Sequence, residues 1–291
     1  MRETVTKTAG LIFMALVIYW APTQAKALTF NETQKLLASD GAAFDYFGVS
    51  VAIDGDTAVI GAYGDDDNGS NSGSVYVFTR SGGTWAQQTK LKASDGAASD
   101  WYGISVAVDG DTAVIGAYWN NVNDSWSGSV YVFIRSGDIW TQQAKLKASD
   151  GTTLDQFGIS VAVDGDTAVI GARGDDDSGS LSGSAYVFTR SGGIWTQQAK
   201  LTASDGAAED LFGHSVAVDG DTTVIGAYQD DDNGGSSGSA YVFTRSGGTW
   251  TQQAKLTASD GASSVQFGIS VAVNSDTAVI GAYGDNDSGV Y

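Results

Sequence analysis

The sequence predicts an all-β protein built from a 55-residue repeat, and two observations support this prediction. A Phe-Gly or Tyr-Gly pair, a Gly-Ala pair and, in each complete repeat, a tryptophan recur at intervals of 55 residues. No segment of the repeat shows a convincing helical period. One copy of each signature per fixed period is typical of a repeat architecture. The recurring positions are Phe47, Tyr102, Phe157, Phe212 and Phe267, then Gly61, Gly116, Gly171, Gly226 and Gly281, and Trp85, Trp140, Trp195 and Trp250.

Each repeat is expected to form four short antiparallel strands. In the first repeat, residues 49–53 alternate as a strand does, and Asp54-Gly55 is a signal for a tight type I′ hairpin turn. The other three strands are expected at residues 57–62, 74–79 and 84–93. Four antiparallel strands per repeat are typical of a β-propeller blade. An open stack of β units or a β-helix is the alternative.

The N-terminus is typical of a signal peptide. Arg2 and Lys7 provide a positive start, residues 9–21 are apolar, and Ala25-Lys26-Ala27 has the small-x-small form of a cleavage site. An uncleaved anchor is the alternative, although the apolar run is short of the roughly 20 residues that span a membrane. We therefore expect a signal peptide at 1–27 and a repeat domain at 28–291. The repeat units are expected at about 44–98, 99–153, 154–208 and 209–263, with a partial unit at 264–291.

The number of blades depends on the two ends of the repeat domain. Residues 32–38 resemble a fourth strand, because Gln34-Lys35-Leu36 is similar to Thr89-Lys90-Leu91. Together with the partial last unit they would form a composite fifth blade, which would close the ring and cover the free sheet edges. The alternative is a truncated piece of a larger propeller, because the third strand of that blade would have to begin near Gly289-Val290-Tyr291.

The charge limits the class of partner. The formal net charge is −19, and no basic patch is visible, so we expect neither nucleic-acid binding nor attraction to an anionic membrane. Cations, or partners with a basic surface, are favoured. The chain has no cysteine, so an exported domain would depend on core packing for its stability.

The motif sequences resemble a known repeat family. Phe47-Gly48-Val49-Ser50-Val51-Ala52, followed by Gly61-Ala62-Tyr63, is similar to the FG-GAP repeat of integrin α-subunit propellers and of many bacterial exported proteins. The resemblance covers residues 31–291 and implies four-stranded propeller blades in an extracellular adhesion or ligand-binding protein. Integrin repeats hold calcium between the FG and GAP elements, where this chain has only a short hairpin, so that site is not implied here. The closer resemblance is to a bacterial subgroup with this short hairpin.

In a propeller, the loops between strands 2 and 3 and between successive blades share one face, called here the loop face. These loops are acidic, and clustered carboxylates are the ligands that Ca²⁺ prefers. Calcium is therefore a candidate cofactor, bound weakly. The alternative is that the aspartates are turn residues that bond nearby backbone. The candidate metal ligands are Asp65, Asp67, Asp175, Asp177, Asp230, Asp232, Asp285 and Asp287.

The second repeat differs from the others in its loops. It carries Trp101, Trp119 and Trp126 with Asn121, and exposed aromatic side chains beside polar ones are common at recognition surfaces. These four residues form a candidate contact patch for a glycan or protein. The alternative is that the three rings pack against each other. The Trp85 series recurs at one strand position, which favours a packing role.

A catalytic function has little support in the sequence. The single histidine, His214, stands where other repeats have Val49 or Ile, so we interpret it as a packing variant in the first strand. No nucleophile elbow or phosphate-binding motif is present. The favoured function is an exported binding or adhesion module that recognises an extracellular protein or glycan. The alternatives are a polysaccharide hydrolase or lyase that uses loop carboxylates, and a structural surface protein; an open ring would permit oligomers.

Overall fold

The computed structural model describes residues 32–121 and 126–285. The chain divides into two units, Met1–Lys35 and Leu36–Tyr291, and the fold described below belongs to the second. The predicted signal peptide at 1–27 lies outside the described residues. Every regular element of the described residues is a β-strand, so the all-β prediction is confirmed.

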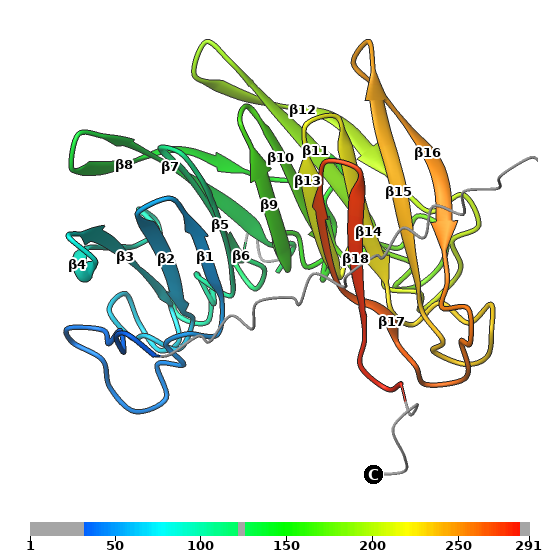
Figure 1. The fold of residues 1–291 in the computed structure, drawn as a ribbon, viewed down its shortest axis with the longest axis horizontal. Coiled ribbons are helices and arrows are strands. Elements are labelled where there is room, and N and C mark those ends of the chain that lie inside the picture. Colours follow the sequence, from blue (N-terminus) through cyan, green and yellow to red (C-terminus); the bar gives the residue numbers. More distant parts are fainter. Residues whose placement is uncertain (1–31, 122–125, 286–291) are drawn as a thin grey trace, which may run out of the picture. The chain divides into compact units, whose positions relative to one another are not determined.

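The strands form five antiparallel sheets that follow one another in chain order (Figure 1). The first four sheets have four strands each and the fifth has two. The first sheet contains β1 (Val51–Asp54), β2 (Thr57–Ala62), β3 (Ser74–Ser81) and β4 (Thr84–Leu91). The second contains β5 (Ser105–Asp109), β6 (Thr112–Ala117), β7 (Ser129–Ser136) and β8 (Ile139–Leu146). The third contains β9 (Ser160–Asp164), β10 (Thr167–Ala172), β11 (Ser184–Ser191) and β12 (Ile194–Leu201).

The fourth sheet contains β13 (Ser215–Asp219), β14 (Thr222–Ala227), β15 (Ser239–Ser246) and β16 (Thr249–Leu256). The fifth contains β17 (Phe267–Asn274) and β18 (Thr277–Ala282). In each sheet the strands pair in the order in which they occur in the chain, which is the predicted blade meander. The predicted strand at residues 32–38 is not formed, and no composite blade is seen among the described residues. Ring closure therefore stays a prediction.

The turn between the first two strands differs from the predicted type. Asp54 pairs with Thr57, so the central turn residues are Gly55 and Asp56. Gly55 has a φ of 53°, whereas Asp56 is not among the residues with positive φ. A type I′ turn needs positive φ at both central positions, so the type I′ prediction is wrong. Glycine at the first central position alone is the arrangement of a type II′ turn.

The core lies between neighbouring sheets. Val59 and Val77 of the first sheet pack against Val106, Ile115 and Tyr131 of the second, and all five side chains are buried. Equivalent clusters join the second sheet to the third and the third to the fourth. Each central sheet is therefore apolar on both faces, as sheets covered on both sides are. The tryptophan series contributes to these contacts as predicted, with Trp140, Trp195 and Trp250 buried.

The Phe-Gly and Gly-Ala pairs form the contact between successive sheets. A Cβ atom on Gly61 would lie 1.9 Å from the carbonyl oxygen of Gly103, which belongs to the next repeat. The Ser50 hydroxyl donates a hydrogen bond of 2.8 Å to that same oxygen. The same serine-to-glycine bond joins Ser105 to Gly158, Ser160 to Gly213 and Ser215 to Gly268. Glycine is thus required at position 61 because a neighbouring backbone occupies the space of a side chain.

The first strands of all five sheets line one cavity of about 450 Å³. Serine and valine pairs from each sheet alternate around it, among them Ser50-Val51 of the first sheet and Ser270-Val271 of the fifth. Strands placed around a common cavity in this way are the arrangement of propeller blades around an axis. The β-propeller-like architecture is therefore confirmed.

Candidate binding face

The acidic loop of the first repeat follows β2, and Asp65 is its buried centre. One carboxylate oxygen of Asp65 accepts bonds from the Asp67 amide at 3.1 Å and the Ser74 hydroxyl at 2.8 Å. The other oxygen accepts bonds from the Tyr76 hydroxyl at 3.1 Å and the Lys90 ammonium at 2.7 Å. A buried carboxylate needs such partners, and Asp65 has four. Its first role is therefore to hold the loop against the sheet.

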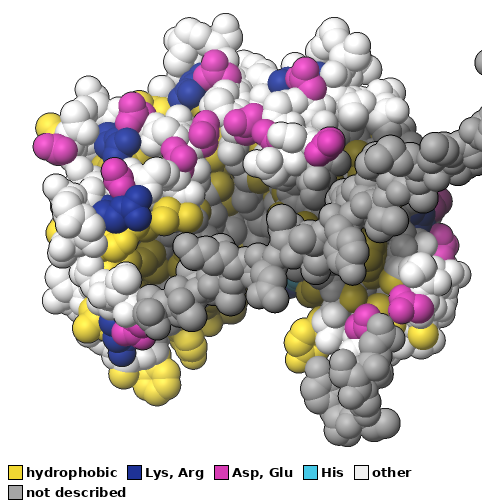
Figure 2. All heavy atoms as spheres, in the orientation of Figure 1, with side chains coloured by type: hydrophobic (Ala, Val, Ile, Leu, Met, Phe, Trp, Pro, Cys, Tyr) yellow, Lys and Arg dark blue, Asp and Glu magenta, His cyan; other side chains and the backbone are white. Residues whose placement is uncertain are grey.

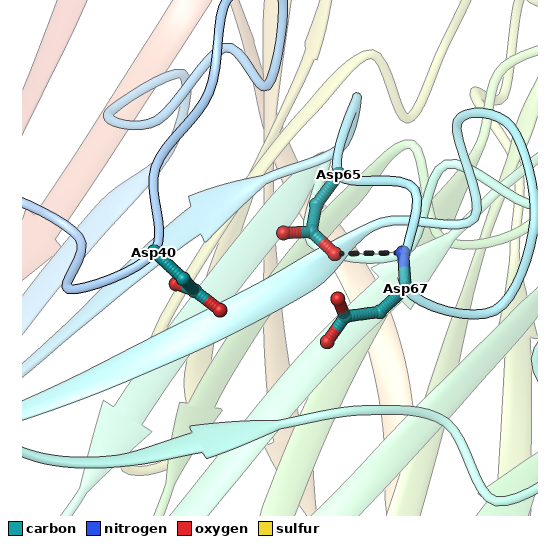
Figure 3. Close-up of side chains that lie close together, drawn as sticks. All are labelled: Asp40, Asp65 and Asp67. Atoms are coloured by element: carbon teal, nitrogen blue, oxygen red, sulfur yellow. Dashed lines mark hydrogen bonds between the residues drawn. The ribbon is translucent and has the colours of Figure 1, made fainter.

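Three aspartates surround the ammonium group of Lys90. Its Nζ lies 2.9 Å from Asp40, 2.7 Å from Asp65 and 2.8 Å from Asp67. Burial acts to lower the pKa of Lys90, but the hydrogen bonds that its ammonium donates to the three carboxylates outweigh burial, so the pKa is raised. Lysine therefore stays charged at neutral pH in this cluster. Figure 3 shows that the three carboxylates converge from two segments of the chain.

The third and fourth repeats repeat this cluster. Lys200 binds the three equivalent aspartates of its repeat, and so does Lys255. The ion pairs are Lys200 with Asp150, Asp175 and Asp177, and Lys255 with Asp205, Asp230 and Asp232. The structure thus brings together six of the eight predicted metal ligands, two in each of the three clusters, around lysine. Asp285 follows β18, and Asp287 lies outside the described residues.

The lysine was missed in the sequence, although a signal for it was present. Lys90, Lys145, Lys200 and Lys255 recur at the same 55-residue interval as the motif glycines. A lysine that recurs in the fourth strand of every complete repeat, in a chain whose loops are acidic in three of those repeats, indicates an internal ion pair. The cluster of Asp40, Asp65 and Asp67 could still hold a metal, because oxygens from the three carboxylates lie within 4.8 Å of one another.

In the second repeat, a neutral asparagine replaces the buried aspartate of this cluster. This residue, Asn120, donates a 2.8 Å bond to Asp100 and accepts a 2.9 Å bond from the Ser129 hydroxyl. Lys145 binds Asp95 at 2.7 Å. Burial raises the pKa of Asp100, and its hydrogen bonds act in the opposite direction. The amide of Asn120 therefore supplies a donor where a second carboxylate would repel Asp100.

Beside this loop, five aromatic rings form a continuous row across the first two repeats. Tyr46 stacks on Tyr63 at 4.8 Å with nearly parallel planes, and Tyr63 contacts Trp101 at 5.0 Å. Trp101 contacts Tyr118 at 5.6 Å and Trp119 at 6.0 Å, in edge-to-face geometry. These separations are those of favourable aromatic pairs. We call Tyr46, Tyr63, Trp101, Tyr118 and Trp119 the aromatic row.

The row contains two residues of the predicted patch, Trp101 and Trp119. The structure brings Trp101 and Trp119 together, which both the predicted contact patch and the alternative of ring packing require. The Trp126 side chain is 46 % exposed, and its backbone nitrogen lies 3.5 Å from the side-chain oxygen of Asn121. The intervening residues 122–125 lie outside the described residues. Sequence reasoning missed Tyr46, Tyr63 and Tyr118, although the two last occupy the third position of the GAP motif.

The backbone conformation of Tyr46 and Trp101 is common to all five repeats, because Gln156, Leu211 and Gln266 at the equivalent positions also have positive φ. Tyr46 and Trp101 have left-handed φ values of 56° and 57°, which residues with a side chain rarely adopt. The conformation therefore belongs to the repeat and does not single out the aromatic row. Tyr46 is exposed, whereas Tyr63, Trp101 and Trp119 are half-buried and Tyr118 is buried. The row is thus partly packed and partly accessible, which combines the two alternatives considered for the tryptophans.

His214 lies one residue before β13, not within the predicted first strand, and it lines the central cavity. Its ring contacts Tyr228 at 4.5 Å. Burial, followed by the nearby charge of Arg173, lowers the pKa of His214 to about 4. The imidazole is therefore neutral at pH 7.

The strand ends away from the acidic loops carry turns with both basic and acidic side chains. Arg80 pairs with Asp56 at 2.7 Å in the first repeat, and the carboxylate of Asp54 accepts a bond from the Gly110 amide of the next repeat. Figure 2 shows basic and acidic side chains in contact on the visible surface. The aspartates of these pairs are mostly exposed, so solvent screens each pair and its contribution to stability is small. They neutralise charge locally and leave the other face as the candidate binding face.

The chain belongs to the FG-GAP repeat family. The family profile, described as FG-GAP repeat, matches residues 30–78, 85–133, 140–188, 195–243 and 250–291. Each of the middle units begins in or near the fourth strand of one sheet and ends in the third strand of the next, so a sequence unit bridges two sheets. No curated protein matches the chain. FG-GAP repeats suggest an extracellular domain.

Among the described residues, no helix has the length and apolar character needed to cross a membrane.

Proposed function

We propose that this chain is an exported binding or adhesion module that recognises a protein or glycan ligand through its loop face. The aromatic row carries the proposal. It offers ring faces and edges of graded exposure beside the polar side chains of Asn121 and the acidic loops. Rigid aromatic side chains with polar neighbours supply contact area at low entropic cost, which suits both glycan and protein recognition. The FG-GAP repeat fold is consistent with a binding module.

The test is binding to a glycan array and to a panel of purified extracellular proteins. Wild-type protein is expected to bind at least one member, and the double variant Tyr63→Ala/Trp101→Ala is expected to lose that binding. Tyr283→Ala is the matched control, because Tyr283 occupies the same GAP position and is 77 % exposed in the last repeat. Unchanged binding by the double variant would contradict the proposal.

We also propose that the module binds without catalysing a reaction. The loop carboxylates that a hydrolase or lyase would use, such as Asp175, are bonded to lysine and tyrosine inside the fold. A pair of carboxylates committed to an internal ammonium is poorly suited to acid–base chemistry. Turnover of any member of a polysaccharide panel, lost in Asp175→Asn, would overturn this proposal.

Calcium is proposed as a weak ligand of Asp40, Asp65 and Asp67. The cation would have to displace Lys90, so we expect affinity in the range of about 10⁻⁴–10⁻³ M that is typical of extracellular modules. Lys90→Met should increase the rise in melting temperature between chelator and millimolar calcium. Lys147→Met is the control, because Lys147 is exposed. An unchanged melting temperature in both wild type and Lys90→Met would remove the calcium hypothesis.

Secretion through residues 1–27 completes the proposal. Expression of the full chain in a secreting host should release a protein that begins at Leu28, and N-terminal sequencing measures this directly. We propose no nucleic-acid partner and no membrane insertion after cleavage, in keeping with the net charge of −19. Retention of the full chain in the membrane fraction would support the uncleaved-anchor alternative instead.

A further inference from the structure

The third position of the GAP motif carries one basic residue. Four repeats have tyrosine there, and the third repeat has Arg173. In a chain with a net charge of −19, a lone arginine at a position otherwise held by aromatic residues changes the local electrostatics. The repeats that have tyrosine at this position indicate which part of the loop face the arginine occupies. Two of these tyrosines, Tyr63 and Tyr118, belong to the aromatic row.

Arg173 is held by two neutral side chains. Its Nε donates a bond of 2.7 Å to the side-chain oxygen of Gln156, and its Nη1 lies 3.2 Å from Nδ1 of His214. Because His214 is neutral at pH 7, its Nδ1 can accept a hydrogen bond from Nη1 of Arg173 in the tautomer that carries the ring hydrogen on Nε2. The guanidinium is half-buried, and these two contacts fix its orientation. A guanidinium has five N–H donors, so these two contacts do not use all of them.

The ion-pair pattern of the other basic residues makes Arg173 unusual. No carboxylate lies within 4.0 Å of Arg173 in the part of the chain that the structure describes. Nine other lysines and arginines of the described residues pair with aspartate: Arg80, Lys90, Lys92, Arg135, Lys145, Arg190, Lys200, Arg245 and Lys255. A half-buried guanidinium without a counter-ion is a ready partner for a carboxylate.

Two neighbours place this guanidinium between the central cavity and the aromatic row. His214, which it contacts, lines the cavity of about 450 Å³. Gln156 and Arg173 occupy the positions in the third repeat that Trp101 and Tyr118 occupy in the second, and they are in contact as that aromatic pair is, so they continue the row into the third repeat. The charge of Arg173 also acts against the rise that burial causes in the pKa of Tyr118. A ligand that stacks on the row can therefore present an anionic group to the arginine.

We propose that Arg173, positioned by Gln156 and His214, is a carboxylate subsite for an acidic polysaccharide whose sugar rings stack on the aromatic row. This inference rests on the proposed function, because it names the ligand class of the same face. A guanidinium binds a carboxylate through two parallel hydrogen bonds, and sugar rings supply the apolar faces that aromatic rings need. The acidic remainder of the surface repels anions, so binding of a uronate is favoured at this half-buried guanidinium, which no carboxylate of the described residues neutralises.

The test uses hexagalacturonate and its methyl ester, which share a backbone and differ in charge, with calorimetry as the readout. Wild-type protein is expected to bind the acid at least about tenfold more tightly than the ester, because charge-assisted hydrogen bonds are the strong ones. Arg173→Tyr installs the residue of the other repeats and should remove this preference while it retains binding of the ester. Lys147→Gln removes one exposed charge elsewhere and should leave the preference intact.

The outcomes separate this inference from the proposed function. If Arg173→Tyr keeps the preference for the acid while Trp101→Ala loses both probes, the carboxylate subsite is wrong and the binding face stands. If wild-type protein binds hexaglutamate peptide as tightly as hexagalacturonate, and through Arg173, the assignment to a polysaccharide is overturned. If wild-type protein binds neither sugar probe, the acidic-polysaccharide inference fails, and the array experiment alone decides the proposed function. An unchanged melting temperature of Arg173→Tyr shows that the variant is folded.

Discussion

The hexapeptide TAVIGA occurs in each of the first three sheets and in the last sheet. It is buried in the first three and partly exposed in the last. Every residue of β2, β6 and β10 is buried, and all three strands have this sequence. The same sequence in β18 is only half-buried. Val169 of β10 is 0 % exposed, whereas the equivalent Val279 of β18 is 65 % exposed. Identical residues therefore differ in environment because β2, β6 and β10 each pair with a strand on both edges, whereas β18 pairs only with β17 among the described residues. β2 is buried although its sheet is the first, because Leu36, Ala38 and Phe47 pack against the cluster that contains Ile60.

The largest expected difference concerns the motif glycine. Gly171→Ala would place its Cβ 1.8 Å from the backbone carbonyl of Gly213 in the next sheet, and a backbone atom cannot move aside cheaply. We expect a loss of more than about 3 kcal/mol in the free energy of unfolding, measured by urea denaturation with tryptophan fluorescence. Gly281→Ala meets only the Ser270 hydroxyl at 2.3 Å, which can rotate, so it should cost less than about 1 kcal/mol. Equal losses would show that the inter-sheet contact is not the cause.

The next effect tests the apolar contact between sheets. Val169→Ala should reduce the free energy of unfolding by about 2 kcal/mol, because it removes buried methyl groups and leaves a cavity. Val279→Ala removes the same atoms from an exposed site and should change stability by less than about 0.5 kcal/mol. The same denaturation experiment measures both. A loss for Val279→Ala as large as that for Val169→Ala would show that another segment covers β18 in solution.

A third difference depends on pH. Burial and the charges of Asp230 and Asp231 raise the pKa of Asp210 to about 6, whereas the last repeat has Val265 at this position. The folded state favours the protonated form of Asp210. The favourable contribution of this form is complete below about pH 4 and is lost as the pH rises to about 6, because the ionised form destabilises the fold. Asp210→Asn keeps an acceptor for the Ala207 amide and should stabilise the protein by about 1–2 kcal/mol at pH 7.

The control for this prediction has the opposite sign. Burial acts to raise the pKa of Asp150, but its bond to Lys200 outweighs burial and lowers the pKa. Its contribution is therefore present at pH 7 and is lost as the pH falls below the ordinary aspartate pKa. Asp150→Asn should destabilise the protein at pH 7 and have a diminishing effect toward pH 3. A gain for Asp210→Asn that persisted unchanged at pH 4 would contradict the titration of Asp210.

The smallest expected difference is in the first hairpin turn. Four repeats have glycine at its first central position, and the last repeat has Ser275 with a φ of 54°. A left-handed conformation is unfavourable for serine and easy for glycine. Ser275→Gly should therefore raise the free energy of unfolding of the last sheet by about 0.5–1 kcal/mol, seen as slower hydrogen exchange in β17 and β18. Gly165→Ser in the third repeat should produce the reverse change in β9 and β10.

Much of the fold could be predicted from the sequence because its signals are local. The second strand of the repeat is found at the predicted residues, and the third and fourth differ by two residues at one end. The prediction of a strand at 32–38 was wrong. This segment is similar to Thr89-Lys90-Leu91 in β4, but β4 pairs with β3 and the segment has no such partner strand among the described residues. The turn type was wrong by one residue of register, since Asp54 completes a pair that the sequence alone does not show.

The candidate site was less predictable, because its contacts join residues far apart in the chain. The sequence placed Asp65 and Asp67 in an acidic loop, but their partner Lys90 comes from a strand that follows that loop, and Asp40 from the preceding linker. The bond between Lys90 and Asp40 spans 50 residues. Likewise, Tyr63 and Trp101 are 38 positions apart and meet only when two sheets pack.

The sequence by itself determined the repeat, the strands and the glycines, because alternation and turn stereochemistry act within a few residues. Only the tertiary structure decided which copy of TAVIGA is buried, which aspartates hold a lysine, and that Arg173 has no counter-ion among the described residues. Burial and ion pairing depend on the neighbouring sheet, and each repeat in the chain obtains that neighbour from another repeat.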